Sequence, residues 1–197
     1  MKANIATGVL LAVFLFGLGG ALGDVNEVYI IRVADAISPG TAEFIHHGIK
    51  SAEKLPAACI IIELDTPGGL AESMRRIVQD ILASTVPVVV YVAPGGARAA
   101  SAGVMITMAA DIAAMAPGTN IGAAHPVGAG GQEIGGTMSD KVVNDMVAQA
   151  KSVAEHRRRN SQWVERAIRE SISATETEAL KENVIDLIAQ DTDDLIR

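Results

Sequence analysis

Two kinds of hydrophobic pattern alternate along most of this chain, and they constrain its fold more than any other feature. Short, continuously apolar runs, typical of buried strands, lie at residues 28–33, 57–64 and 87–92. Amphipathic segments with helical spacing lie between them, at 38–54 and 70–84. Strand and helix in strict turn form βαβ units, whose parallel strands are covered on both faces and therefore lack polar alternation. The pattern predicts an α/β layered domain with a mostly parallel sheet covered by helices.

The second half of the chain continues the pattern with shorter elements. We predict a helix of small residues at 98–110, a strand at 111–116, a mobile loop at 132–138, helices at 139–158 and 161–170, and a last strand at 184–189. The sequence Ser173-Ala-Thr-Glu176 resembles a capping box. The basic run Glu155–Asn160 is expected to be a solvated cap on the end of its own helix, with contact to anionic lipid or a partner as the alternative.

The first 23 residues differ from the rest. After Met1-Lys2, residues 3–23 carry no charge, and the small residues Ala21 and Gly23 precede a plausible cleavage point before Asp24. This pattern predicts a signal peptide, and a retained N-terminal anchor is the alternative. Either way, we expect residues 24–197 to form one exported domain on the extracytoplasmic or periplasmic side.

Charge and cysteine content exclude several classes of protein. The chain has 197 residues with 23 acidic and 16 basic side chains, a formal net charge of −7, so it lacks the positive charge of a nucleic-acid binder. The single cysteine, Cys59, lies in an apolar run and cannot form an internal disulfide. His46 and His47 are expected on a helix surface, without cysteine or carboxylate at ligand spacing. We therefore expect no nucleic-acid partner, no metal site and no cofactor.

Three segments could together supply a hydrolase site, which needs a nucleophile, a base and backbone amides aimed at the developing oxyanion. The segment Asp65–Gly69 (DTPGG) joins a predicted strand to a helix, and its two glycines allow close approach of the backbone to a ligand. Ser101 is flanked by small side chains in AASAG, so its hydroxyl is accessible and the Ala102 N–H could point at the same oxyanion. Each segment alone is also compatible with an ordinary turn or a packed helix.

Lys141, in SDKVVN, is the third candidate. A solvated lysine is almost fully protonated at pH 7, so it can act as a base only when it is desolvated or placed near positive potential. Met138, Val142 and Val143 could supply apolar surroundings, and a helix N-terminus would disfavour the ammonium form. A solvated lysine paired with Asp140 or Asp145 is the plain alternative.

The order DTPGG, RAASAG, APGTNIGAAHPVG (116–128) and then a lysine on a long helix resembles the NfeD-type membrane serine proteases, the stomatin-operon partner proteins. These belong to the broader Clp-protease and crotonase-like fold, built from repeated β-β-α and βαβ units. The resemblance covers the chain from Val25 to about Asp194. It implies that Ser101 is the nucleophile, that Lys141 is the general base, and that the amides of Gly68 or Gly69 with Ala102 form the oxyanion hole.

His125 gives a rival base. It follows Ser101 by twenty-four residues, near where the soluble Clp proteases, which use a Ser-His-Asp triad, place their histidine. A histidine can accept a proton near neutral pH without special surroundings. We favour Lys141 because the resemblance to the membrane family, which uses lysine, is closer, and His125 then lines the site or supports the structure.

The resemblance implies an exported serine endopeptidase with a Ser101–Lys141 dyad that cleaves hydrophobic peptide segments near the membrane, including those of stomatin-like proteins. It also implies association with the membrane and assembly into a homo-oligomer, a dimer or larger. Family members usually continue into transmembrane helices and a small β-barrel domain, so we expect this chain to be a short or truncated member. Two alternatives are a catalytically silent scaffold that binds a stomatin-like partner and a crotonase-like acyl-CoA enzyme, although the latter would need a catalytic carboxylate and a basic pocket for phosphates.

Overall fold

A sheet of five parallel strands forms the centre of the computed structural model, in the order β1-β2-β3-β5-β8. The strands are β1 (Glu27–Ala34), β2 (Ala57–Asp65), β3 (Val88–Val92), β5 (Ile112–Met115) and β8 (Leu187–Ile188). The structure describes residues 27–55, 57–128 and 136–197, without the side chains of 136–138. The predicted signal peptide or anchor therefore lies outside the described residues. The three apolar runs of the first half of the chain are β1, β2 and β3, as predicted.

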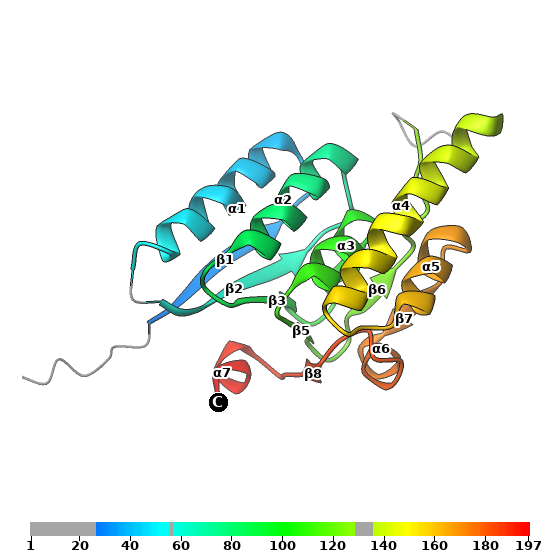
Figure 1. Cartoon of the computed structure of the whole chain (residues 1–197). Coiled ribbons are helices and arrows are strands. Elements are labelled where there is room, and N and C mark those ends of the chain that lie inside the picture. The colour runs from blue at the N-terminus through cyan, green and yellow to red at the C-terminus, as the bar shows by residue number, and fades with distance from the viewer. Residues whose placement is uncertain (1–26, 56, 129–135) are drawn as a thin grey trace, which may run out of the picture.

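Helices α1 (Pro39–Ala52), α2 (Ala71–Ala83) and α3 (Ala102–Ala109) lie on one face of this sheet (Figure 1). Ser38 caps α1 by accepting a hydrogen bond from the Thr41 N–H, and Pro39 occupies the first turn, where its missing N–H costs nothing. All eight residues of α3 are buried. The main hydrophobic core lies between this face and the three helices. Because α3 is buried on every side, its small residues are needed for close packing.

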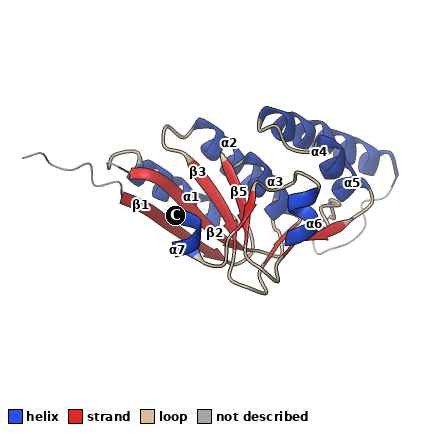
Figure 2. Ribbon diagram, turned by 90° about the horizontal axis from the view of Figure 1, so that it is seen from below, coloured by secondary structure: helices blue, strands red, loops and turns tan. Residues whose placement is uncertain are grey.

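The opposite face of the sheet carries a smaller apolar cluster that includes Ile61, Val89 and Tyr91. Helix α7 (Thr192–Ile196) lies against this face (Figure 2) and contributes Leu195 to the cluster. Burial raises the pKa of the Tyr91 phenol, whose hydroxyl donates a hydrogen bond to the Ala189 carbonyl.

The predicted helix at 98–110 is wrong at its start, because residues 98–100 form a strand of a second, three-stranded sheet. Its strands are β4 (Arg98–Ala100), β6 (Asn120–Gly122) and β7 (Ser173–Thr175), and they occur in that order. Residues 98–100 have high helix propensity, but they pair with β6 in parallel and form a bridge from Ala99 to Thr66. These tertiary hydrogen bonds outweigh the local preference for helix. The helix therefore begins at Ala102, and Ser101 lies between β4 and α3.

Helices α4 (Gly136–His156), α5 (Ser161–Arg169) and α6 (Glu176–Lys181) complete the fold. The capping box that begins α6 is formed by Thr175 and Glu178, two residues later than the sequence pattern suggested, because Ser173 is part of β7. The predicted loop at 132–138 lies largely outside the described residues, and α4 already includes its last three positions.

The basic end of α4 also differs from the expectation of a solvated cap. Arg159 is only 5% exposed, and the Arg157 side chain is half-buried. Both guanidinium groups donate hydrogen bonds to carbonyls at the end of α3 rather than to α4. The prediction was wrong because the charge of the segment does not reveal the carbonyl acceptors at the end of α3, which lie far away in the sequence.

Candidate active site

Ser101 sits on a strained turn between β4 and α3. Its backbone has φ 52° and ψ −111°, a region that residues with a side chain rarely adopt. Two hydrogen bonds hold this conformation: the Ala100 N–H donates to the Thr66 carbonyl (3.1 Å), and the Ser101 N–H donates to the Gly122 carbonyl (3.0 Å). The turn thus resembles the strand-to-helix elbow that presents the nucleophilic serine in α/β-hydrolases.

The Asp65–Gly69 loop lies directly against this turn. The Asp65 carboxylate accepts a hydrogen bond from the Arg98 N–H (3.0 Å), and Thr66 is fully buried. Gly68 has φ +111°, and a Cβ there would lie 2.6 Å from the Ser101 Cβ. Only glycine allows the loop and the serine to approach so closely.

Two backbone N–H groups near Ser101 are available to a ligand. The Gly68 N–H donates to Thr66 Oγ1 (3.1 Å), so it is already used. The Gly69 N–H has no hydrogen-bond partner in the part of the chain that the structure describes, and the Ala102 N–H, at the first position of α3, has no acceptor within its helix. Of the two glycines considered from the sequence, Gly69 is therefore the one whose amide could bind an oxyanion.

Ser101 lines a mostly apolar cavity of about 300 Å³. The other lining residues come from the loop after β2, from α2, α3 and α4, and from the segment after β6; they are Gly69, Leu70, Ala71, Met74, Ala102, Pro126, Val127, Gly128 and Met146. Sequence reasoning missed Met74 and Met146, because methionines at helical spacing are typical of an ordinary core. The cavity is suited to an apolar side chain.

Lys141 lines the neighbouring cavity, of about 330 Å³, together with Val142, Arg75 and Asp145. The two cavities share the wall formed by Ala71, Met74, Pro126 and Met146. Lys141 is exposed and lies in the second turn of α4, so the predicted desolvation is absent in this structure, and no hydrogen bond joins it to Ser101 among the described residues. Asp145 pairs with Arg75 (3.4 Å). The structure places Ser101 and Lys141 in the linings of adjacent cavities, with no hydrogen bond between these two described residues.

The histidines occupy other places. His125 Nδ1 makes a hydrogen bond with the Ile168 carbonyl of α5 (2.9 Å), and His125 lines neither cavity. His46 contacts Asp80 and His47 contacts Glu43 on the surface of α1 and α2. Among the described residues, no group of histidine, cysteine and carboxylate side chains could hold a metal ion.

Comparison with known proteins identifies the family. A family profile described as "NfeD1b, N-terminal domain" matches residues 27–195. The chain belongs to this family. Membrane-bound protease PH1510 of Pyrococcus horikoshii is 41% identical over 174 residues, which cover 87% of this chain and 39% of that protein. Membrane protein NfeD1b of Bacillus subtilis is 33% identical over 184 residues, covering 91% of this chain and 40% of that protein. This NfeD1b-type chain thus spans about two fifths of the length of the curated relatives it matches.

Solved structures confirm the predicted fold. A lysine-to-alanine mutant of the 1510-N membrane-bound stomatin-specific protease, in complex with a substrate peptide, superimposes with a TM-score of 0.82 at 40% identity, covering 87% of this chain and 78% of that one. A serine-to-alanine mutant of the same protease gives 0.81 at 41% identity, with 87% and 83% covered. ClpP1 from Listeria monocytogenes shares the fold, with a TM-score of 0.67 at 19% identity over 84% and 93% of the two chains. In the described part of this NfeD1b-type domain, no helix is long and apolar enough to cross a membrane.

Proposed function

We propose that this domain is the catalytic part of a membrane-associated serine endopeptidase that uses Ser101 as nucleophile and Lys141 as general base. The observation that carries the proposal is the strained Ser101 turn with two amides available beside it. Strain of this kind costs about 1–3 kcal/mol and persists where surrounding structure enforces it, often at functional sites. The names of the relatives, a membrane-bound protease among them, support the same reaction.

In the proposed reaction, Ser101 Oγ attacks the scissile carbonyl carbon while its proton passes to Lys141 Nζ. The carbonyl oxygen becomes an oxyanion bound by the N–H groups of Gly69 and Ala102. The C–N bond then breaks, and Lys141 returns the proton to the leaving amine. Water then attacks the acyl-enzyme carbonyl while Lys141 accepts one of its protons. The ester C–O bond breaks, the acid product leaves, and Lys141 returns that proton to Ser101 Oγ.

Lys141 must reach Ser101 from the neighbouring cavity. Its long side chain needs to cross only the wall that the two cavities share, and catalytic hydrogen bonds are often formed only when substrate is bound. Occupation of the Ser101 cavity by an apolar side chain would also remove water from that route. His125 is the weaker candidate because its Nδ1 is held by the Ile168 carbonyl and its ring lines neither cavity.

We propose hydrophobic peptide segments as the substrate class. The apolar lining around Ser101 favours an apolar side chain next to the scissile bond. The solved relatives are described as specific for stomatin, which makes the hydrophobic segments of a stomatin-like membrane protein the first substrates to test. Export of the domain, its membrane association and its assembly into a homo-oligomer remain predictions, which reporter fusions and sedimentation can check.

Active-site labelling tests the proposal. A fluorophosphonate probe should modify Ser101 in the parent protein, and Ser101→Ala should abolish both labelling and cleavage of an apolar peptide, by about 10⁴–10⁶-fold in kcat. Ser152→Ala, at an exposed serine of α4, is the matched control and should leave both unchanged. A folded parent that binds the peptide but neither cleaves it nor reacts with the probe would instead be a scaffold for a stomatin-like partner.

A further inference from the structure

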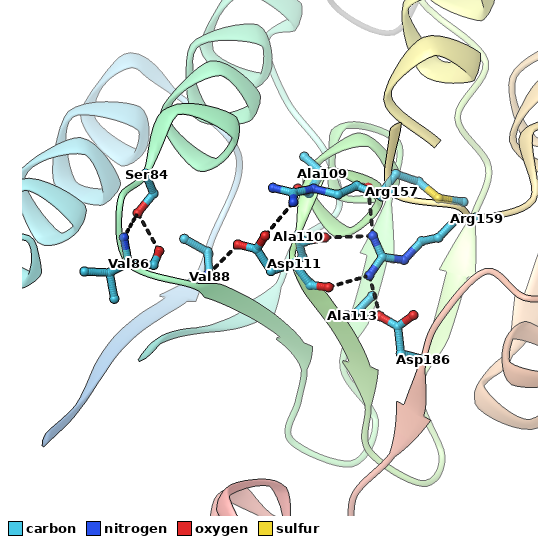
Figure 3. A network of polar contacts seen from close by, with 11 residues as sticks. Ser84, Val86, Val88, Ala109, Ala110, Asp111, Ala113, Arg157, Arg159 and Asp186 are labelled. Atoms are coloured by element: carbon cyan, nitrogen blue, oxygen red, sulfur yellow. Dashed lines mark hydrogen bonds and ion pairs between the residues drawn. The ribbon is translucent and has the colours of Figure 1, made fainter. Parts of the chain in front are cut away.

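The buried end of α3, the helix that follows Ser101, depends on two arginines from elsewhere in the chain. The carbonyls at a helix C-terminus lack partners within the helix. Arg159 Nη1 donates to the carbonyls of Met108 (3.1 Å) and Ala110 (2.8 Å), and Arg157 Nε donates to that of Ala109 (2.8 Å) (Figure 3). The two guanidinium groups thus satisfy three successive carbonyls at the end of the nucleophile helix.

The same two arginines directly follow α4, the helix that carries Lys141. The Arg158 N–H donates to the Glu155 carbonyl and the Arg159 N–H to that of Ala154, with Arg158 at φ +58°. This is a Schellman motif, which normally has glycine at the position with positive φ. The turn reverses the chain sharply and lets both arginines reach α3.

Two carboxylates anchor this contact to the central sheet. Asp111 binds Arg157 and accepts a hydrogen bond from the Val88 N–H of β3 (2.8 Å). Asp186 binds Arg159 and accepts one from the Ala113 N–H of β5 (2.7 Å). We call Arg157, Arg159, Asp111 and Asp186 the arginine joint. It connects the C-terminal ends of α3 and α4 to each other and to the sheet (Figure 3).

We infer that Arg157 and Arg159 are positioning residues that align Lys141 with Ser101, an inference that rests on the proposed function. Ser101 and Lys141 lie near the N-terminal ends of two helices whose other ends meet at the arginine joint. Lys141 is about 23 Å along α4 from that end, so a tilt of about 5° at the joint moves it by about 2 Å. A misplacement of about 1 Å can reduce the rate of an enzyme about 100-fold.

The other ion pairs of α4 have more exposed basic groups than the arginine joint. Its described pairs with α2 and α5 are Arg75–Asp145 and Lys151–Glu165, with exposures of 44% and 73% in the first and 38% and 30% in the second. In the arginine joint the Arg157 and Arg159 side chains are 17% and 1% exposed, and their partners Asp111 and Asp186 are 34% and 38% exposed. Exposed pairs constrain geometry weakly. Among the described contacts, the joint differs because its largely buried guanidinium groups also donate to the carbonyls at the end of α3.

A double-mutant cycle separates alignment of the dyad from general stability. We would measure kcat and KM on an apolar peptide and on an activated ester for the parent, Arg157→Gln, Lys141→Ala and the double variant. Arg157→Gln should lower kcat about 10–100-fold with KM changed less than about 2-fold. In the Lys141→Ala background it should have almost no further effect, because no base remains to be misplaced. Arg157→Lys, which keeps the charge but offers a single donating nitrogen in place of the guanidinium fork, should recover part of the loss.

Arg166→Gln is the matched control, because this exposed arginine of α5 pairs only loosely with Glu170 (3.8 Å). If Arg157→Gln does not unfold cooperatively, Arg157→Lys replaces it in the cycle. An unchanged kcat in the folded variant overturns the inference, and so does an equal loss in the Lys141→Ala background. A parent in which Ser101 cannot be labelled overturns the proposed function, and with it the inference, whereas an active parent with an insensitive arginine joint overturns the inference alone.

Discussion

The turn at Ser101 and the helical segment at Lys141 differ in how firmly the fold holds them. At this turn the Ser101 backbone is strained, the N–H groups of Ala100 and Ser101 donate to two other segments, and Gly68 lies in direct contact. Lys141 is an exposed side chain on a helix whose polar contacts near it are surface pairs. The proposed nucleophile and its amides are thus preorganised, while the proposed base is placed by a long helix and would complete the site only by crossing to the neighbouring cavity.

The largest effect expected from this difference is at Lys141. Because the side chain is exposed, Lys141→Ala should leave the free energy of unfolding unchanged within about 0.5 kcal/mol. Because it would remove the base, kcat should fall about 10³–10⁴-fold. Urea unfolding and peptide hydrolysis on the same preparation test both expectations. A large decrease in the free energy of unfolding would contradict this expectation, because it would show that Lys141 stabilises the fold.

At the Ser101 turn, activity and stability should fall together. Gly68→Ala places a Cβ 2.6 Å from the Ser101 Cβ at a φ of +111°, so we expect about 2–4 kcal/mol of destabilisation and at least about a 100-fold loss of kcat. Gly118→Ala is the matched control: its φ is +77°, but nothing lies within 4 Å of the added Cβ. It should cost about 1 kcal/mol and leave the reaction unaffected. Equal effects at the two glycines would contradict the account.

His125 should behave as a structural residue. His125→Ala removes the hydrogen bond to the Ile168 carbonyl and should cost about 1 kcal/mol of stability, with kcat changed by less than about 3-fold. Thermal unfolding and initial rates measure the two effects. A loss of activity like that expected for Lys141→Ala would make His125 the base.

The smallest effect concerns how α4 is held to α5. The hydrogen bond from Lys151, followed by that from Arg169, lowers the pKa of Glu165. A carboxyl whose pKa is lowered on folding adds stability above its unfolded pKa, and the contribution disappears as the pH falls through the folded value. Glu165→Gln should therefore lower the urea midpoint slightly at pH 7 and by less at about pH 3, whereas Glu170→Gln, in the looser 3.8 Å pair, should have less effect. Identical shifts at both pH values would show that charge is not involved.

The sequence alone predicts the elements whose structure follows from hydrophobic periodicity. It does not predict the elements whose structure depends on contacts with backbone far away in the sequence. The strands and helices of the first half follow from apolar runs and amphipathic spacing, and the family from four motifs in order. Arg98–Ala100 became a strand because β6 and Thr66 supply hydrogen bonds that local propensity cannot anticipate. The buried role of Arg159 could not be predicted for the same reason, since its acceptors lie about fifty residues away in the sequence.

In the candidate site, too, some features could be predicted from the sequence and others could not. Ser101, Gly69 and Ala102 were identified as candidates from short motifs, and the structure places them together. The sequence could not decide whether the Gly68 or the Gly69 amide is available to an oxyanion. The structure favours Gly69, because the Thr66 hydroxyl accepts a hydrogen bond from the Gly68 N–H. The sequence did not identify Met74 and Met146 as cavity residues, because an apolar residue at helical spacing looks the same whether it packs in the core or lines a cavity.

The most direct measurement is the distance from Ser101 Oγ to Lys141 Nζ in a crystal structure of the protein with a peptide-like inhibitor bonded to Ser101. The account predicts that Nζ lies within about 3 Å of Oγ and that the inhibitor oxygen accepts hydrogen bonds from the N–H groups of Gly69 and Ala102. A Lys141 side chain that stays in solvent while His125 Nε2 contacts Oγ would contradict it.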